Sequence, residues 1–264
     1  MSAANLDRLL EAAPGFGSCG RCPYLAGGSA ELCFRCAHRT MEPLAPPDRR
    51  CEVCDQTYAD DTGACRNPVC KMGQRWFEWN YAAAMRSGVL EQVISAYKYS
   101  SPTSGDRGWA AIFGRILVGF LEAHERAFET VDLIVASPTY TGPGSRRAWD
   151  HIRGILVAAD REQVTPGRWP FDLIEPPAVI KTADTPSMVS MKTYRDRRVN
   201  AEGLLRTALS VPDASRIEGR RIIVVDDVFT DGLTLREVAR VLRQDGRAAS
   251  VHGVTLARQP YGRH

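Results

Sequence analysis

Long apolar runs, an excess of charge of one sign, and cysteine in the larger part of the chain are all missing from this sequence of 264 residues. No stretch reaches about 18 consecutive apolar residues, so no membrane span is expected. Lys and Arg total 34 against 31 Asp and Glu, which argues against binding any polyanion through overall charge. The first 14 residues include Asp7, Arg8 and Glu11 and lack a continuous apolar core. They do not have the pattern of a secretory signal, so a cytoplasmic location is expected.

The composition changes sharply along the chain. All eight cysteines lie between Cys19 and Cys70, and none occurs in the remaining 194 residues (264 − 70). The sequence therefore predicts a cysteine-rich, zinc-binding module over residues 1–75 and a larger domain over 76–264, with a short linker near residues 73–79. The 44% hydrophobic and 25% charged content is ordinary for a folded protein and excludes a disordered or collagen-like chain.

The cysteines form close pairs with a repeated spacing. Each half of the array has a Cys-x2-Cys pair, ten further residues and a second close pair. Two such pairs can surround one ion with four thiolates, and a closed shell of four sulfurs is typical of structural Zn(II). The predicted metal ligands are Cys19, Cys22, Cys33, Cys36, Cys51, Cys54, Cys65 and Cys70.

The spacing leaves open how these ligands share the ions. The duplication favours one Zn(II) in each half, and therefore two structural ions in a small zinc-ribbon-like module. A cross-braced arrangement, in which Cys19, Cys22, Cys51 and Cys54 hold one ion, uses the same residues. A disulfide framework is the weaker interpretation because no export signal is expected. The module has few large apolar residues, so bound metal would supply folding energy.

After residue 80 the hydrophobic pattern alternates between helical and strand periodicity, which predicts an α/β fold with a parallel sheet flanked by helices on both faces. Residues 165–177 lack clear periodicity and are expected to form a surface excursion. The expected helices are 89–97, 112–121, 149–159, 200–209 and 234–244, and the expected strands are 131–136, 178–181, 222–225 and 251–256.

The most informative stretch joins a buried strand to a helix. Residues 222–225 are aliphatic, Asp226 and Asp227 follow, and a short loop containing Gly232 leads to a helix expected to begin at Thr234. Loop amides and a helix N-terminus can bind phosphate. Adjacent carboxylates can accept hydrogen bonds from ribose hydroxyls or hold Mg(II). At the carboxyl edge of a parallel sheet, these features together predict a site for a phosphorylated sugar.

Each feature also has a plain structural interpretation. Asp226 and Asp227 could merely solvate the end of a strand, and Thr234 could be an ordinary N-cap. Taken singly, those interpretations are preferable. The combination of strand, acids, loop and helix favours the phosphosugar site.

The same stretch resembles the signature of the type I phosphoribosyltransferases, and the whole chain resembles the ComF family, in which cysteine pairs precede a phosphoribosyltransferase-like domain. Further similarity lies in residues 88–99, in the Arg-x-x-Asn-x-x-Gly pattern from Arg197, and in the last strand before Arg258. Asp231 departs from the pattern because the family usually has a threonine there. A carboxylate at this position should repel a 5′-phosphate unless it turns outward or meets a cation.

The resemblance implies 5-phosphoribosyl 1-pyrophosphate (PRPP) and Mg(II) as ligands. It implies that Asp226 and Asp227, the predicted catalytic residues, face the ribose hydroxyls and the ion. The loop would hold the 5′-phosphate, while Ser137 with an arginine partner would hold pyrophosphate, beneath a mobile lid at residues 192–198. The implied ligand-binding residues are Thr230, Asp231, Gly232, Leu233, Thr234, Ser137, Arg146, Arg147, Lys192 and Arg197.

An enzyme that transfers a phosphoribosyl group is the first hypothesis, and a regulator that senses PRPP without turnover is a related one. The alternative is a non-enzymatic accessory factor of DNA uptake in natural transformation, which would contact single-stranded DNA or a protein of the competence machinery. Its basic face would include Arg236, Arg240, Arg243 and Arg247, spaced three or four residues apart. An ordinary solvent-exposed helix face is the preferred interpretation of that stripe. The acceptor substrate and the oligomeric state are not predicted.

Overall fold

A computed structural model describes residues 41–58, 63–99, 108–163 and 165–261. Its centre is a sheet of four parallel strands in the order β1-β6-β5-β2. The strands are β1 (Asn80–Met85), β2 (Leu133–Ala136), β5 (Arg221–Phe229) and β6 (Ser250–Arg258). A parallel sheet flanked by helices confirms the expected fold class.

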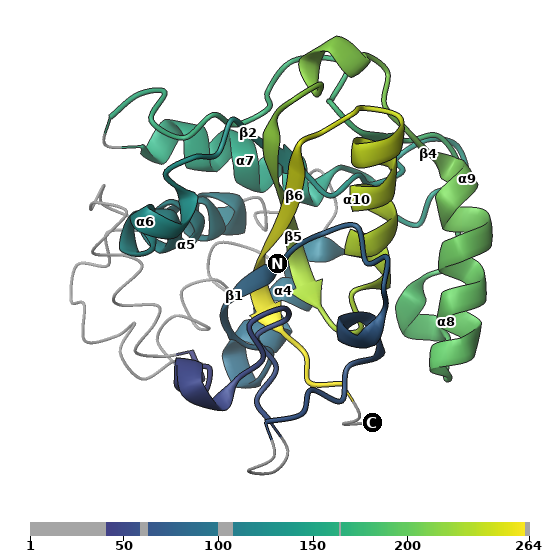
Figure 1. Ribbon diagram of the computed structural model, residues 1–264. Helices are drawn as coiled ribbons and strands as arrows, with labels where there is room; N and C mark the ends of the chain where they lie inside the picture. The colour runs from purple at the N-terminus through teal and green to yellow at the C-terminus, as the bar shows by residue number, and fades with distance from the viewer. Residues whose placement is uncertain (1–40, 59–62, 100–107, 164, 262–264) are drawn as a thin grey trace.

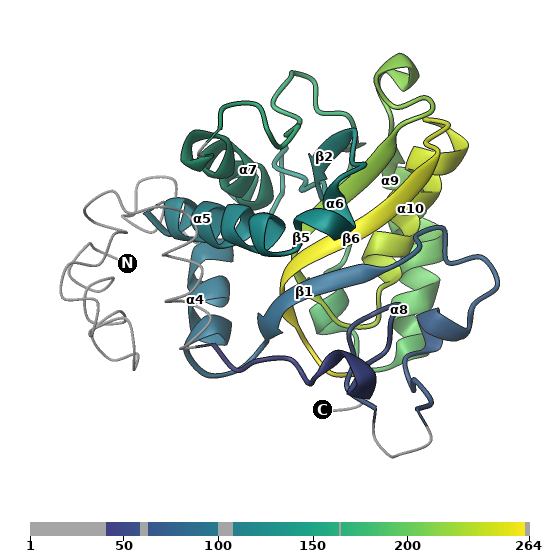
Figure 2. The ribbon, with the colours of Figure 1, turned by 60° about the vertical axis from the view of Figure 1, so that its left-hand side comes forward.

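Both faces of this sheet are buried, as an aliphatic strand without polar alternation predicts. In β5, Ile223 and Val225 face one hydrophobic core, while Ile222 and Val224 face the other. The first core is covered by α4, α5 and α7, and the second by α10, so the helices lie on opposite sides of the sheet (Figures 1 and 2). These helices are α4 (Gly88–Lys98), α5 (Gly108–Ala123), α7 (His151–Glu162) and α10 (Leu233–Gln244).

Shorter elements connect this framework. The strands β3 and β4 form a separate antiparallel pair, and α8 runs through a π-helical turn into α9. Their bounds are α6 (Glu125–Phe128), β3 (Ile180–Lys181), α8 (Tyr194–Asn200), the π-helical turn (Ala201–Leu205), α9 (Arg206–Ala208) and β4 (Leu209–Ser210). The 3-10 helices are η1 (Pro47–Arg49), η2 (Pro68–Lys71), η4 (Met188–Ser190) and η6 (Ala214–Arg216).

The fold differs from the expectations in three places. Strand β1 was not expected, because its three consecutive alanines have little β propensity and it is held by pairing with β6. The helix expected over 200–209 begins earlier, at Tyr194, and gives way to β4 at Leu209. The segment 165–177 is only partly a surface excursion, since Trp169 is buried and Phe171 pairs with Ile134 at the open edge of β2.

No helix within the described parts of the chain has the length and apolarity needed to cross a membrane.

Candidate functional site

Strand β5 extends beyond its neighbour β2. The pairing of β5 with β2 ends at Val225 and Ala136, whereas its pairing with β6 continues to Phe229 and Arg258. Asp226 and Asp227 therefore lie within β5, which extends beyond the strand expected over residues 222–225. They lie where β2 has stopped, which is the place where open parallel sheets bind ligands.

Asp227 is buried and paired with two side chains from other elements. Its Oδ2 lies 2.6 Å from Nζ of Lys98, at the end of α4, and 3.1 Å from Nε2 of His151, at the start of α7. Burial by itself would raise the pKa of Asp227. The Lys98 charge and the His151 hydrogen bond outweigh that effect and hold the pKa well below its usual range. Asp227 is therefore ionised at neutral pH.

The hydrogen bonds around His151 assign its tautomer. The ionised Asp227 can only accept, and its Oδ2 lies 3.1 Å from Nε2 of His151, whereas Nη1 of Arg147 lies 3.1 Å from Nδ1 and 3.3 Å from Nε2. The proton of the neutral ring is then on Nε2, which donates to Asp227. Burial, opposed by the Asp227 charge, lowers the pKa of His151 to about 4. At neutral pH this histidine is an uncharged donor that orients Asp227.

Asp226 has a different environment from its neighbour. It is half-buried, and its Oδ1 accepts a hydrogen bond of 2.9 Å from the backbone N–H of Asp227. Burial and the Asp227 charge raise the pKa of Asp226 to about 7, despite nearby Lys98 and Ser137. The two adjacent acids thus differ in protonation, and Asp226 is the more accessible one.

The bend after β5 carries the predicted phosphate-binding loop. Gly232 has a φ of 81° and is the N-cap of α10, so the helix begins at Leu233, one residue before the expected start at Thr234. A Cβ atom at Gly232 would lie 2.6 Å from the ring of Phe229 and 3.0 Å from Val69, so a side chain is excluded there. The positive φ independently favours glycine. Thr234, a half-buried residue, is therefore not the N-cap.

Asp231 meets the cation that its position in the loop requires. Its Oδ2 lies 2.6 Å from Nε of Arg197 on α8, and both side chains are buried. Its Oδ1 accepts a hydrogen bond of 3.1 Å from the backbone N–H of Leu233. The Asp231 carboxylate thus accepts a hydrogen bond from an amide at the helix N-terminus, a donor of the kind that would bind phosphate.

The other predicted ligand-binding residues fall into two groups. Ser137 is buried directly after β2, Arg147 is half-buried beside His151, and Thr230 is half-buried at the bend. Arg146 and Lys192 are exposed. The expected lid at residues 192–198 is mostly helical, because α8 begins at Tyr194 and Arg197 is fixed to Asp231.

Four of the predicted metal ligands form a cluster. The Sγ atoms of Cys51, Cys54, Cys65 and Cys70 all lie within 4.8 Å of one another, with separations of 3.8 Å for Cys51–Cys70 and 3.7 Å for Cys54–Cys65. A tetrahedron with zinc–sulfur bonds of about 2.3 Å has edges of about 3.8 Å. These distances are far longer than the roughly 2.05 Å of a disulfide. The cluster therefore has the donor set and the size for one Zn(II).

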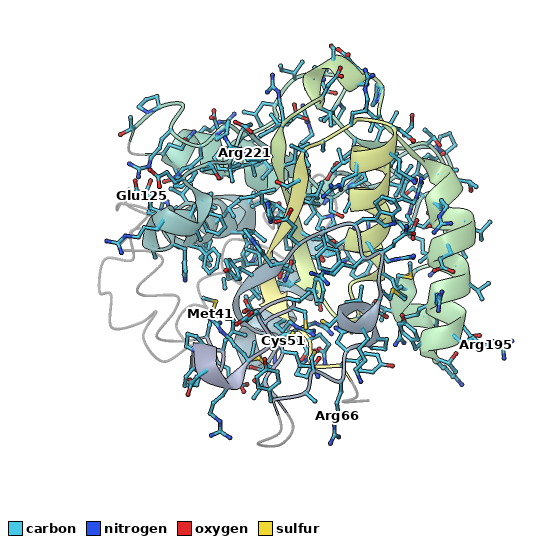
Figure 3. The ribbon with its side chains drawn as sticks, in the orientation of Figure 1. Met41, Cys51, Arg66, Glu125, Arg195 and Arg221 are labelled. Carbon is cyan, nitrogen blue, oxygen red and sulfur yellow. The ribbon has the colours of Figure 1, made fainter. Side chains whose placement is uncertain are left out.

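This grouping is the one predicted for the second half of the cysteine array. The cross-braced alternative, which places Cys51 and Cys54 in a different site from Cys65 and Cys70, does not fit it. The predicted ligands of the other half lie outside the described residues: Cys19, Cys22, Cys33 and Cys36. Figure 3 shows Cys51 at the end of the molecule where β5 and β6 finish.

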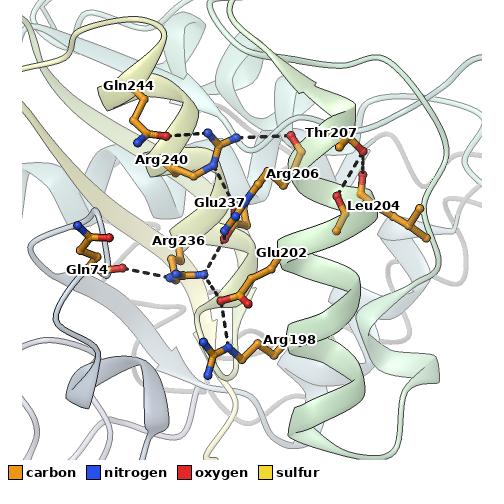
Figure 4. Close-up of polar contacts among 11 residues, drawn as sticks. Gln74, Arg198, Glu202, Leu204, Arg206, Thr207, Arg236, Glu237, Arg240 and Gln244 are labelled. Atoms are coloured by element: carbon orange, nitrogen blue, oxygen red, sulfur yellow. Dashed lines mark hydrogen bonds and ion pairs between the residues drawn. The ribbon is translucent and has the colours of Figure 1, made fainter.

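Two of the four arginines in the stripe that was expected to be solvent-exposed, Arg236 and Arg240, are instead held in ion pairs with a buried carboxylate. Arg236 and Arg240 both pair with Glu237, which is fully buried, and Arg206 of α9 pairs with the same carboxylate (Figure 4). Arg236 also contacts Glu202. Arg236 and Arg240 therefore join α10 to the segment after α8. The other two residues of the stripe differ, since Arg243 is half-buried and Arg247 lies beyond the end of α10, where it is exposed and paired with Glu218.

Lys98 and His151 were not identified as site residues from the sequence. Each lies on a helix distant from Asp227 in the sequence, and only the tertiary fold brings it within contact distance. Lys98 does occur in the stretch 88–99 that carries part of the family resemblance, which was the available signal.

Comparison with known proteins matches part of the chain. Residues 180–264 match the family described as the phosphoribosyl transferase domain. The competence protein ComFC of Bacillus subtilis is 38% identical over 64 residues, which are 24% of this chain and 27% of that protein. An orotate phosphoribosyltransferase of Xylella fastidiosa is 34% identical over 67 residues, 25% of this chain and 29% of that protein. These matches, each under a third of the relative's length, confirm the resemblance and the phosphoribosyltransferase-like domain.

Proposed function

We propose that this protein binds PRPP or a closely related phosphosugar together with Mg(II), and that it transfers the phosphoribosyl group. One observation carries the proposal. The acid pair of β5 lies beyond the end of β2, and two residues later the strand leads into the bend at 230–232 and the N-terminus of α10. Carboxylates for a diol or cation and amides for a phosphate are therefore adjacent.

The residues suit the separate parts of such a ligand. Asp226 is half-buried, whereas the Oδ2 atom of Asp227 already contacts Lys98. The Asp226 carboxylate would therefore accept hydrogen bonds from the ribose hydroxyls or bind Mg(II), a hard cation that prefers oxygen. Ser137 and Arg147 would bind the pyrophosphate. The 5′-phosphate would lie against the bend and the first turn of α10. Its hydrogen-bond donors would be backbone amides and hydroxyls of Thr230, Gly232, Leu233 and Thr234.

To accelerate this reaction, the protein must stabilise the charges that develop in the transition state. When pyrophosphate leaves, positive charge develops at the ribose carbon, and a fixed anion nearby stabilises it. Asp227 is suited to this task because Lys98 and His151 hold it ionised and in one orientation. When bound, Mg(II) would neutralise charge on the departing pyrophosphate.

Asp231 constrains how the phosphate can enter. Its contacts with Arg197 and the Leu233 amide occupy donors that a phosphate would use. Binding of a 5′-phosphate therefore requires Arg197 to be shared between two anions, or Asp231 to move from the bend. In either case Arg197 is the cation that balances the added charge.

Titration calorimetry with PRPP and Mg(II) tests the proposal. Asp226→Asn should weaken binding by at least about tenfold, since a charge-assisted interaction contributes about 1.5–3 kcal/mol. Asp245→Asn, the same change at the exposed carboxyl end of α10, should leave affinity unchanged. Failure of the parent protein to bind PRPP, or equal loss with both variants, would contradict the assignment of the site.

A further inference from the structure

The guanidinium of Arg258 joins the cysteine cluster to the bend after β5. Arg258 ends β6 and is fully buried. On one side, its Nε donates to the carbonyl oxygen of Cys54 at 2.6 Å, and its Nη2 donates to Oε1 of Gln56 at 2.8 Å. On the other side, its Nη1 donates to the carbonyl oxygens of Phe229 at 2.9 Å and Thr230 at 2.8 Å. One rigid, planar group thus fixes two segments that are distant in the sequence.

Asn67 makes a second connection between the same two segments. Its Nδ2 donates to the carbonyl oxygen of Thr230 at 3.0 Å and lies 3.9 Å from Sγ of Cys54. Its backbone N–H lies 3.4 Å from Sγ of Cys65. Asn67 is fully buried, so these contacts occur where water cannot replace them.

Packing makes a third connection. Val69, which precedes the ligand Cys70, is fully buried and lies against Gly232. Phe77 meets Phe229 edge to face, with ring centroids 6.1 Å apart. The surface that supports the bend is therefore built from residues beside the metal ligands.

From these contacts we propose that metal binding at the four-cysteine cluster sets the conformation of the 230–232 bend, so that metal and phosphosugar bind with positive coupling. Arg258 is the positioning residue that transmits the effect. The inference rests on the proposed function, because it concerns the phosphate-binding part of the same site.

The physical basis is the position of the groups that hold the bend. Four thiolates around Zn(II) carry a net negative charge, and Nη2 of Arg258 lies 3.5 Å from Sγ of Cys54. Metal binding fixes the Cys54 carbonyl, Asn67 and Val69 relative to one another. Without metal these groups are free to separate, and Arg258 and the bend lose their common support.

Thermodynamic reciprocity provides a strict test of such coupling. If zinc raises the affinity for PRPP by some factor, PRPP must raise the affinity for zinc by the same factor. The first factor can be measured by titrating Mg(II)–PRPP into zinc-loaded protein and into protein stripped with a zinc-selective chelator. The second comes from competition with a chromophoric chelator, with and without PRPP. Couplings of this kind are typically about 5- to 150-fold, and we expect both factors to agree within that range.

Arg258→Lys tests the residue that transmits the effect. Lysine keeps the charge but cannot make the forked contacts to both segments. We expect the variant to retain zinc and to bind PRPP at least about fivefold more weakly. Hydrogen exchange of the amides at residues 230–233 should also become faster. In cobalt-substituted protein, PRPP should shift the thiolate–cobalt absorption of the parent more than that of the variant. Arg115→Lys, a change at a buried arginine paired with Glu162, is the matched control. It should leave the PRPP affinity, the hydrogen exchange of residues 230–233 and the PRPP-induced cobalt shift as they are in the parent.

The outcomes separate the two proposals. Equal PRPP affinity of zinc-loaded and zinc-free protein overturns the coupling and leaves the proposed function intact. If the zinc-free protein unfolds, the coupling is tested by the PRPP affinity of the zinc-loaded Arg258→Lys variant. A zinc-loaded variant with the parent's PRPP affinity overturns the role of Arg258 and with it the coupling. Failure of every form to bind PRPP overturns both proposals.

Discussion

Asp226 and Asp227 show how two identical neighbours acquire different chemistry from their surroundings. Lys98 and His151 contact Asp227, whereas burial and the charge of Asp227 itself act on Asp226. The pair titrates as a unit, with one carboxylate ionised at low pH and the other near neutrality. A ligand cation therefore meets a site whose charge changes within the physiological range.

This asymmetry predicts a pH dependence of ligand binding. Below pH 7 Asp226 holds a proton, because its pKa is raised to about 7, and a protonated carboxyl is a poor ligand for Mg(II). Affinity for Mg(II)–PRPP should therefore rise by up to about tenfold per pH unit below 7 and level off above it. Calorimetry between pH 6 and 8 measures this.

The phosphates of PRPP also titrate in this range, so the variant Asp226→Asn isolates the contribution of the protein. Its affinity should vary less with pH than that of the parent. If the two profiles are parallel, Asp226 is not the titrating group.

Most substitutions in the proposed site should weaken ligand binding, but a substitution of Asp231 is expected to strengthen it. Asp231→Thr removes a carboxylate from the Leu233 amide and frees Arg197 to pair with phosphate. We expect affinity for PRPP and for ribose 5-phosphate to increase by about tenfold, equivalent to roughly 1.4 kcal/mol. The unliganded variant should be less stable, since Arg197 is left buried without its partner.

The comparison variant for this position is Asp231→Glu, which keeps the charge in a longer side chain. It should not tighten binding. Weaker binding by Asp231→Thr would mean that Asp231 supports the ligand through Arg197 and does not compete with it.

Among the elements, helix α10 has two roles. Its N-terminus forms part of the proposed phosphate site, and its middle holds the helix to the segment after α8. Its first turn begins at Gly232 beside the bend, while its middle is attached to the segment after α8 through Glu237. Three arginines share that buried carboxylate: Arg206, Arg236 and Arg240 (Figure 4). The position of α10, and with it the geometry of the proposed phosphate site, therefore depends on one ionic cluster.

Glu237→Gln should destabilise the protein strongly. Loss of the central charge leaves several guanidinium groups without compensation, and breaking a buried pair typically costs about 3–5 kcal/mol. The free energy of unfolding in urea measures this. Glu218→Gln removes an exposed pair with Arg247 and should cost less than about 1 kcal/mol. If both variants lose a similar free energy of unfolding, the buried ion pairs of Glu237 stabilise the protein no more than an exposed pair does.

Elements with a strong local pattern could be predicted from the sequence, and those held by distant partners could not. The aliphatic run of β5 and the periodicity of α10 identified both elements and the bend between them. Strand β1 has an alanine-rich sequence, and only its pairing with β6 makes it a strand. Likewise, the partners of Asp227 and Asp231 come from α4, α7 and α8, which no local spacing relates to β5.

At the scale of the whole molecule, the cysteine-bearing segment covers the outer edge of the sheet. Strand β1 is an edge strand, and its Asn80 N–H donates to the carbonyl oxygen of Val53 at 2.8 Å. The Ala82 N–H donates to Oδ2 of Asp55, also at 2.8 Å. Figures 1 and 2 show this segment at the end of the molecule where β5 and β6 finish. Metal bound at the four-cysteine cluster would thus help to protect an edge that could otherwise pair with another chain.

Zinc removal should therefore lower the melting temperature and promote aggregation. A loss of about 2–3 kcal/mol corresponds to a decrease of roughly 4–12 °C for a domain of this size. Differential scanning calorimetry with light scattering, before and after chelation, measures both effects. Re-addition of zinc should restore the original transition. Identical transitions with and without zinc would contradict a stabilising role.

The position of β6 has a consequence for synthesis of the chain. This strand lies between β1 and β5, and Asn80 pairs with Gly253, 173 residues later (253 − 80). At a translation rate of about 5–20 residues per second, β1 leaves the ribosome roughly 9–35 s before its partner is made. The nascent chain thus spends that interval with an incomplete sheet, and chaperones have a definite period in which to shield it.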